Sequence, residues 1–247
     1  MIIDRTVGRV QRVRHELKFR DLQVVRVASV SPHFRSVTFS GAALNDFISA
    51  SFDDHIKLIL NPDTDAMVRR DYTPRSYDAA TGELTLEFAI HDNNGPAASW
   101  AAQATVGQRA TIAGPRGSFV IPLDYDWHLL TGDETALPAI VRRLEELPAS
   151  AHAIVVLMVP DVSDRRTLHS AASLDIHWVN DAEQWIAAVR ALTLPTGDGY
   201  TWCAGEANTV ATLRRVLVEE KGVARHAIRA AAYWKRGAIA HHENLED

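Results

Sequence analysis

The sequence predicts two units of different architecture: an N-terminal antiparallel six-stranded β-barrel, followed by a parallel α/β unit. Its 247 residues are enough for one large or two small domains. In the first half, apolar residues alternate with period two, as strands do. In the second half, short apolar runs alternate with stripes of helical spacing. We place the boundary between residues 126 and 127.

The barrel is predicted from short strands separated by turn signals. In Glu83–Ile90, Leu84 and every second residue after it are apolar and share one face. Ile56–Leu60 has the same pattern, which leaves Lys57 and Ile59 on its other side. Further short strands are expected at Val24–Val30, Ser36–Phe39 and Arg109–Ala113. Many short strands that close on themselves favour a small antiparallel barrel.

The α/β unit is predicted from buried strands that alternate with helices. Apolar residues from Leu137 to Leu147 recur at spacings of three and four, which is typical of a one-faced helix. Two more helices are expected at Asp181–Leu192 and Asn208–Lys221. The expected strands are His128–Thr131, Ala153–Val159, Ile176–Val179, Tyr200–Ala204 and Ile228–Tyr233. This order indicates a parallel sheet covered on both faces.

Composition excludes several classes of protein. Lys and Arg number 26 and Asp and Glu 31, a net charge of −5, so binding of nucleic acid through overall charge is not expected. The longest apolar run, Ala153 to Val159, is far shorter than the about 20 residues that span a bilayer. The basic N-terminus lacks an apolar secretory segment, and the one cysteine, Cys203, excludes an internal disulfide and a Cys-based metal site. A cytoplasmic protein is expected.

The most informative stretch is Arg69 to Asp78, which reads Arg-Arg-Asp-Tyr-Thr-Pro-Arg-Ser-Tyr-Asp. Arg70 and Arg75 bracket a Tyr-Thr pair just before a turn. Arginine can bind a phosphate through two hydrogen bonds, tyrosine offers a flat surface to a ring, and threonine offers a hydroxyl. The stretch indicates a cofactor site; the alternative is a solvated, charged edge strand with a turn.

A second stretch follows the strand that ends at Ile90. Residues 91–101 read His-Asp-Asn-Asn-Gly-Pro-Ala-Ala-Ser-Trp-Ala, a loop that enters a helix. Exposed amides at such a helix start can bind phosphate without help from side chains. The alternative is a loop with an ordinary helix cap. Both stretches lie in the predicted barrel, and each is compatible with phosphate.

Two glycines at strand ends indicate a nucleotide crevice in the second unit. Leu130–Ala139 is a strand-to-helix turn with Gly132 at the bend, and Cys203–Glu206 contains Gly205. A parallel sheet binds nucleotides at such turns. Neither a G-x-G-x-x-G fingerprint nor a P-loop occurs in the chain, which disfavours an ordinary Rossmann dehydrogenase or P-loop enzyme.

The pattern Arg70-x-Tyr72-Thr73-x-Arg75 resembles the flavin-binding motif of the siderophore-interacting proteins, or ferric-chelate reductases, of the ferredoxin-reductase-like superfamily. Six further segments resemble the family and occur in family order. They are Asp54–Leu58, His91 with Gly95–Ala97, Ala113–Ser118, Gly132–Ala139, Ala204–Glu206 and Tyr233–Gly237.

The resemblance implies an FAD-binding barrel at 1–126 and an NAD(P)H-binding unit at 127–247 whose C-terminal tail reaches the flavin. The implied FAD-binding residues are Arg70, Asp71, Tyr72, Thr73, Arg75, Ala89, His91, Asp92, Asn94, Gly95, Pro96, Ala97, Ala98, Ser99, Trp100 and Trp234. The implied NAD(P)H-binding residues are Gly132, Asp133, Glu134, Thr135, Ala136, Gly205 and Glu206, with Arg165 and Arg166 where a 2′-phosphate would lie.

The implied activity is reduction of a ferric siderophore to release Fe(II), with electrons from NADPH or NADH passing through FAD. No catalytic acid or nucleophile is needed, because the flavin carries the chemistry. Candidates for contact with an anionic siderophore are Lys57, Arg116, Lys235 and Arg236, which could equally be surface cations. The alternatives are a ferredoxin-driven reductase, a non-catalytic siderophore or flavin carrier, and a different flavin reductase. We expect a monomer without a protein metal site.

Overall fold

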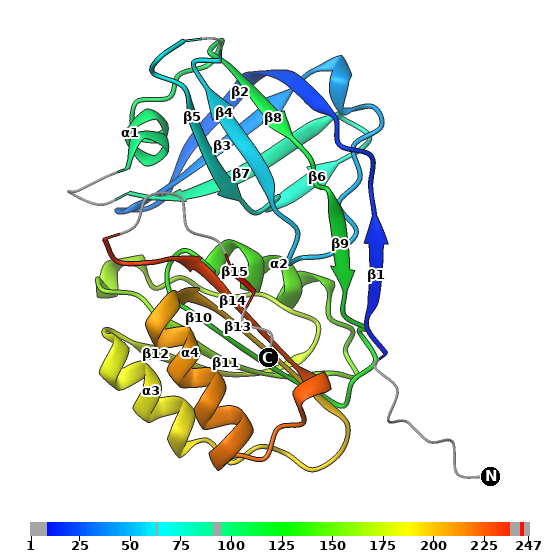
Figure 1. Cartoon of the computed structure of the whole chain (residues 1–247), viewed down its shortest axis with the longest axis vertical. Helices are drawn as coiled ribbons and strands as arrows, with labels where there is room; N and C mark the ends of the chain where they lie inside the picture. The colour runs from blue at the N-terminus through cyan, green and yellow to red at the C-terminus, as the bar shows by residue number, and fades with distance from the viewer. Residues whose placement is uncertain (1–8, 63, 91–94, 238–242, 245–247) are drawn as a thin grey trace. The chain divides into compact units, whose positions relative to one another are not determined.

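The computed structural model describes residues 9–62, 64–90, 95–237 and 243–244 (Figure 1). The chain forms two compact units. The barrel unit comprises Arg12–Phe119 and the short segment Ser163–Thr167, and the α/β unit comprises Val120–Val162 and Leu168–Asp247 with the chain up to Gln11. The chain therefore passes between the units at residues 119–120, and it returns to the barrel unit once for the five residues of Ser163–Thr167.

The barrel unit is built on an antiparallel sheet of seven strands in the order β5-β4-β8-β2-β3-β7-β6. The prediction of six strands was one short, because the stretch around Pro74 forms two separate strands, β5 and β6. Both are edge strands, so the sheet is a half-barrel. The strands are β2 (Phe19–Ser31), β3 (Phe34–Ser40), β4 (Ile56–Leu60), β5 (Val68–Tyr72), β6 (Ser76–Asp78), β7 (Glu83–Ala89) and β8 (Arg109–Ala113). β1 (Gln11–Arg14) and β9 (Gly117–Val120) pair in a sheet of two strands.

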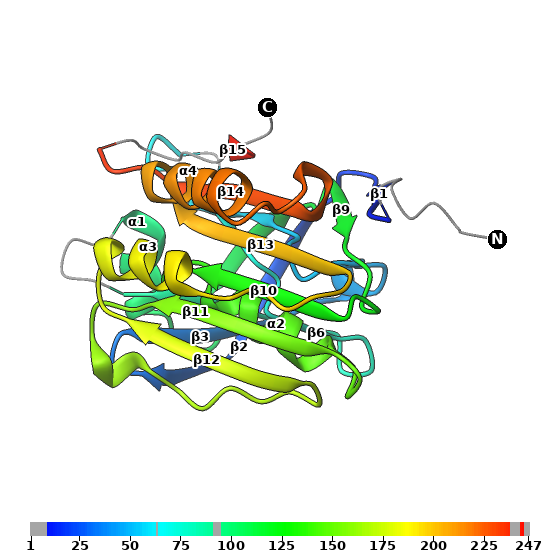
Figure 2. The ribbon, with the colours of Figure 1, turned by 90° about the horizontal axis from the view of Figure 1, so that it is seen from below.

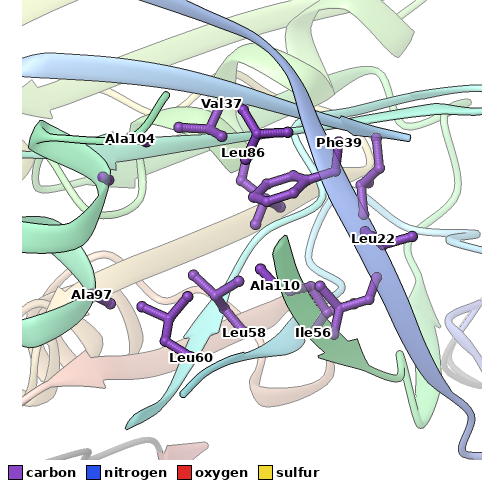
Figure 3. Packing of buried hydrophobic residues seen from close by; sticks show 14 of the residues in the cluster. Leu22, Val37, Phe39, Ile56, Leu58, Leu60, Leu86, Ala97, Ala104 and Ala110 are labelled. Atoms are coloured by element: carbon purple, nitrogen blue, oxygen red, sulfur yellow. The ribbon is translucent and has the colours of Figure 1, made fainter. Parts of the chain in front are cut away.

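Alternating apolar side chains of these strands fill the interior of the half-barrel (Figure 3). Leu58, Phe39 and Leu86 come from three different strands and are fully buried. Ile59 is buried as well, although the alternation assigned it to the opposite side. Short helix α1 (Pro96–Ala102) contributes Ala97 to the same core, so the core fixes where this helix begins.

The α/β unit has a sheet in the order β12-β11-β10-β13-β14-β15 (Figure 2). Its first five strands are parallel, and β15 is an antiparallel edge strand. The strands are β10 (Trp127–Gly132), β11 (His152–Met158), β12 (Ser173–Val179), β13 (Gly199–Glu206), β14 (Ile228–Trp234) and β15 (Glu243–Asn244). The five strands predicted for this half are all present.

Helices cover both faces of this sheet, as predicted. Figures 1 and 2 show α3 (Ala182–Ala191) and α4 (Ala207–Arg215) on one face and α2 (Leu137–Glu146) on the other. The last predicted turns of α4 form a wider helical turn at Val216–Glu220. The carboxyl ends of the parallel strands share one edge of the sheet, and α2 and α4 begin there. None of the helices in the described part of the chain is long and apolar enough to cross a membrane.

Candidate functional site

The first group of predicted site residues lies on edge strand β5 of the barrel unit. In the register with β4, Arg70 lies opposite Leu58 and Tyr72 opposite Ile56. The strand ends at Tyr72, and Arg75 then bonds to β7, since its backbone N–H donates to the Thr85 carbonyl at 2.9 Å. The residues of the motif are thereby held at a bend between the two edges of the half-barrel.

Tyr72 presents an aromatic ring at this bend. Its ring packs on Phe88, with the ring centroids 4.3 Å apart. Burial raises the pKa of the Tyr72 phenol well above its ordinary value, against the lowering effect of Arg70, so the hydroxyl is neutral at physiological pH. Trp100 packs on Phe88 as well and stacks on Phe39, each with ring centroids 6.2 Å apart, so it contacts the barrel core as well as belonging to the predicted cofactor stretch.

Arg70 is a half-buried cation beside Tyr72. Its guanidinium donates to the Arg69 carbonyl at 2.8 Å, and it forms no ion pair with any other described residue. The Arg70 guanidinium has no carboxylate partner among the described residues, so it can donate to a phosphate of a flavin dinucleotide. The neighbouring Tyr72 ring and the hydroxyl of the buried Thr73 fit the flavin ring. The chemistry of this edge therefore agrees with the predicted FAD site.

Arg75, unlike Arg70, forms an ion pair with a carboxylate of the barrel unit. Its Nε lies 3.4 Å from the carboxylate of Glu87, which also accepts a hydrogen bond from Arg166 at 2.6 Å. Arg166, predicted to lie near a nucleotide 2′-phosphate, belongs to the barrel-unit segment Ser163–Thr167, and its guanidinium lies over the ring of Phe34. Arg165 is half-buried in the same segment.

The second group surrounds the start of α1. Gly95 and Pro96 are exposed at the helix start, and the Ser99 N–H already donates to the Gly95 carbonyl at 2.9 Å. Ala98 and Ser99 are half-buried, and so is Ala89 at the end of β7. The predicted site residues His91, Asp92 and Asn94 lie outside the described residues.

The predicted substrate cations differ in their surroundings. Lys57 donates to both oxygens of Asp71, at 2.7 and 2.6 Å, so these two predicted residues form an ion pair with each other. Arg116, Lys235 and Arg236 are exposed. The half-exposed Lys57 therefore contributes less net positive charge than the sequence suggested.

In the α/β unit, Gly132 and Asp133 form the bend after β10. A Cβ at position 132 would lie 2.5 Å from the Cβ of Ala136, so only glycine lets the chain turn directly into α2. Asp133 is fully buried, and Glu134 and Glu206 are nearly so. The predicted residues of this unit thus meet at the carboxyl edge of the sheet.

Glu206 is the N-terminal cap of α4. Its carboxylate accepts hydrogen bonds from the Thr209 N–H at 2.9 Å and the Thr209 hydroxyl at 3.1 Å. These bonds outweigh the opposing effect of burial and hold the pKa of Glu206 below its ordinary value, so it is a carboxylate at neutral pH.

Cys203 is buried in β13, one strand from this bend. Burial, together with the nearby Asp133, raises the pKa of its thiol to about 12, so it remains a protonated, inert side chain. Among the residues that the structure describes, no cluster of His, Cys, Asp or Glu could hold a metal ion.

Comparison with known proteins decides the family. The model described as siderophore-interacting FAD-binding domain matches residues 23–68 and 61–119, and the model described as siderophore-interacting protein matches residues 125–237. The chain is 39% identical to the NADPH-dependent ferric-chelate reductase of Escherichia coli K12, over 91% of this chain and 96% of that protein. The chain belongs to the siderophore-interacting protein family.

Two further relatives agree with this assignment. The ferric vibriobactin reductase ViuB of Vibrio cholerae is 31% identical over 91% of this siderophore-interacting protein and 93% of its own length. A crystal structure of a siderophore utilization protein from T. fusca superposes with a TM-score of 0.87 and 32% identity, covering 94% of this chain and 98% of that one. The predicted family and fold are thereby confirmed.

Two carboxylates that organise the barrel unit were missed in the sequence. Glu87 stands at a polar position of an alternating strand, which the pattern assigns to solvent, yet it is buried between Arg75 and Arg166. Asp164 is buried in the returning segment, where it accepts hydrogen bonds from Ser31 and His33. Partners so distant along the chain leave no local signal in a single sequence.

Proposed function

We propose that this protein reduces ferric siderophores with electrons from NADPH and uses FAD as its cofactor. The observation that carries the proposal is similarity to a ferric-chelate reductase along nearly the whole chain, combined with the Arg70–Tyr72 edge in the FAD-binding unit. The balanced reaction converts NADPH and two Fe(III) chelates into NADP⁺, one proton and two Fe(II). Because NADPH is supplied inside the cell, we place the reaction in the cytoplasm, and we propose a monomer.

FAD supplies the conversion of a two-electron donor into two one-electron transfers. In our proposal the Arg70 guanidinium binds the FAD phosphates, while the Tyr72 ring and the Thr73 hydroxyl hold the flavin ring. Gly95–Ser99, at the start of α1, would contact the remaining chain of the cofactor. No side chain needs to act as acid or nucleophile; these residues bind and orient.

The remaining roles follow from charge and position. Exposed Arg116, Lys235 and Arg236 attract the anionic chelate, and Lys57 assists while paired with Asp71. The turns at Gly132–Ala136 and Gly205–Glu206 line the nicotinamide-nucleotide crevice. Arg166 is bound to Glu87, so we assign no 2′-phosphate to it.

The test starts from the absorption spectrum of the purified, FAD-reconstituted protein. NADPH added without oxygen should bleach the flavin band, and ferric citrate should restore it while an Fe(II)-specific chelator reports the product. A flavin that only reduced ferredoxin bleaches would transfer the protein to the ferredoxin-driven class. A flavin that is bleached but never reoxidised by ferric chelates would contradict the proposal, as would failure to bind FAD.

A paired substitution tests the cofactor edge. Arg70→Gln removes the half-buried cation and should weaken FAD binding about tenfold or more, the value of one charge-assisted hydrogen bond. Arg69→Gln changes the exposed neighbour on the opposite face of β5 and should leave the affinity for FAD within about twofold. Equal losses in the two variants, measured by flavin fluorescence titration, would show that the edge binds through general charge alone.

A further inference from the structure

The buried carboxylate of Asp133 uses all of its hydrogen-bonding capacity within the chain. Its Oδ1 accepts from the Thr135 N–H at 3.0 Å and from the Thr135 hydroxyl at 2.5 Å. Its Oδ2 accepts from the Glu206 N–H and from the Trp234 indole N–H, both at 2.8 Å. Thr135 lies in the turn that follows β10, and Glu206 and Trp234 are the last residues of β13 and β14, so the donors come from three neighbouring strand ends of the sheet. The side chain is therefore turned into the protein.

The backbone at Gly205 is adapted to this carboxylate. Gly205 has φ +150°, and a Cβ there would lie only 2.4 Å from Asp133 Oδ2. Any other residue would displace the carboxylate from its donors. The glycine of this motif thus creates the space in which Asp133 reaches both the Glu206 N–H and the indole of Trp234.

A second carboxylate holds the residues that follow Trp234. Glu206, which caps α4, also accepts from the Arg236 N–H at 3.5 Å. Trp234 is half-buried, whereas the side chains of Lys235 and Arg236 are exposed. Asp133 therefore holds the indole of Trp234, Glu206 holds the backbone N–H of Arg236, and the side chains of Lys235 and Arg236 stay in solvent.

We propose that Asp133 is a positioning residue for the reduction of ferric chelates, acting through Trp234. By fixing the indole at the end of β14, its carboxylate fixes where Lys235 and Arg236 are held for an anionic chelate. This inference rests on the proposed function and deepens it. It gives the Asp133 side chain a role in recognition of the iron substrate, while the rest of the turn Gly132–Ala136 lines the nicotinamide-nucleotide crevice.

The decisive substitution is Asp133→Asn. An amide offers one acceptor oxygen and one donor group, so it cannot accept from both the Thr135 pair and the Glu206–Trp234 pair. The free energy of one hydrogen bond to a charged acceptor corresponds to about a tenfold change in a binding constant. We expect the KM for ferric citrate to rise about tenfold in this variant. The KM for a neutral ferric hydroxamate chelate should rise much less, because the displaced groups are cations.

Trp234→Phe keeps a ring and removes only the indole N–H. This variant should also raise the KM for ferric citrate. The double variant should have a KM no higher than that of Asp133→Asn, because both substitutions remove the same contact between Asp133 and Trp234. Asp164→Asn is the matched control: it alters a buried carboxylate of the barrel unit that accepts from Ser31 and His33, and it should leave the KM for ferric citrate unchanged.

The contact itself has a readout that does not depend on activity. The chain has six tryptophans, so ¹⁵N-indole spectra are simple, and Trp234→Phe identifies the Trp234 signal. Asp133→Asn should move that signal, and Asp164→Asn should not. A moved signal with an unchanged KM for ferric citrate would overturn the proposal, and so would a KM that rises for NADPH instead. If the wild-type protein reduces no ferric chelate, the proposed function fails, while the indole signal still reports whether the contact exists.

Discussion

The two units hold their buried polar groups in different ways. In the barrel unit, buried carboxylates face cationic or ionisable groups: Glu87 lies between Arg75 and Arg166, and Asp164 accepts from His33 Nδ1 at 2.8 Å. In the α/β unit, the groups of the described residues that bond to Asp133 are all neutral N–H and O–H donors. The same kind of side chain is thus balanced by charge in one unit and by fixed dipoles in the other.

The pKa values of Asp164 and Asp133 are also shifted in opposite directions. Burial raises the pKa of Asp164, but the hydrogen bonds of Ser31 and His33 outweigh it and hold the value below the usual range. Burial of Asp133 is complete and outweighs four hydrogen bonds, so its pKa is raised. Asp164 therefore stabilises the fold at neutral pH, and that stabilisation is lost as the pH falls through its lowered pKa. For Asp133 the free energy of unfolding decreases as the pH rises from about 4 towards its raised pKa, because the carboxyl ionises first in the unfolded chain.

The largest loss of stability is expected at Gly205, whose backbone lies against the carboxylate of Asp133. Gly205→Ala would place a Cβ against Asp133 Oδ2 at a φ that L-residues rarely adopt, and we expect a loss of about 4 kcal/mol in the free energy of unfolding. Gly82→Ala in the barrel unit is the control. It also has positive φ, +63°, but nothing lies within 4 Å of the added Cβ, so a loss of about 1 kcal/mol is expected. Urea denaturation measures both.

The second largest effect tests the barrel unit. Glu87→Gln removes the shared anion between two guanidinium groups, and the side chain of Glu87 is only 8% exposed, so we expect a loss of about 3 kcal/mol. Glu83→Gln on the same strand breaks a pair with the mostly exposed Arg26 and should cost less than about 1 kcal/mol. Similar losses in the two variants would show that the buried triad is no stronger than a surface ion pair.

The fold could be predicted from the sequence because its signals are local. The alternation in Ile56–Leu60 and the helical stripe from Leu137 come from neighbouring residues, and both elements are present. The division of 69–78 into β5 and β6 depends on how Pro74 bends the chain between two sheet edges, which the strand pattern does not specify.

The site could be predicted only as a set of motifs. The motif around Tyr72 and the bend at Gly132 were found because each is short and lies at a strand end. The partners of their side chains were not found: Arg166 meets Glu87 from 79 residues away, and Trp234 meets Asp133 from 101 residues away. Such pairs are set by sheet order and by the path of the returning segment, and a single sequence encodes neither locally.

The smallest effect concerns a buried base of the α/β unit. Burial, with a further contribution from the charge of Arg143, lowers the pKa of His128 from 6.5 to about 4. Between these values the unfolded chain binds a proton that the folded protein does not, so stability falls as the pH is lowered through this window. We expect a loss of about 2 kcal/mol between pH 7.5 and pH 5.

His128→Leu removes this proton uptake and should flatten the decline, measured as the urea midpoint at several pH values. His177→Leu is the control, because it replaces a histidine of the same unit that is 41% exposed on β12 and not buried. If the decline is unchanged in His128→Leu and absent in His177→Leu, the acid sensitivity of this unit comes from its surface. The contrast between a charge-balanced barrel unit and a dipole-solvated α/β unit would then not extend to His128.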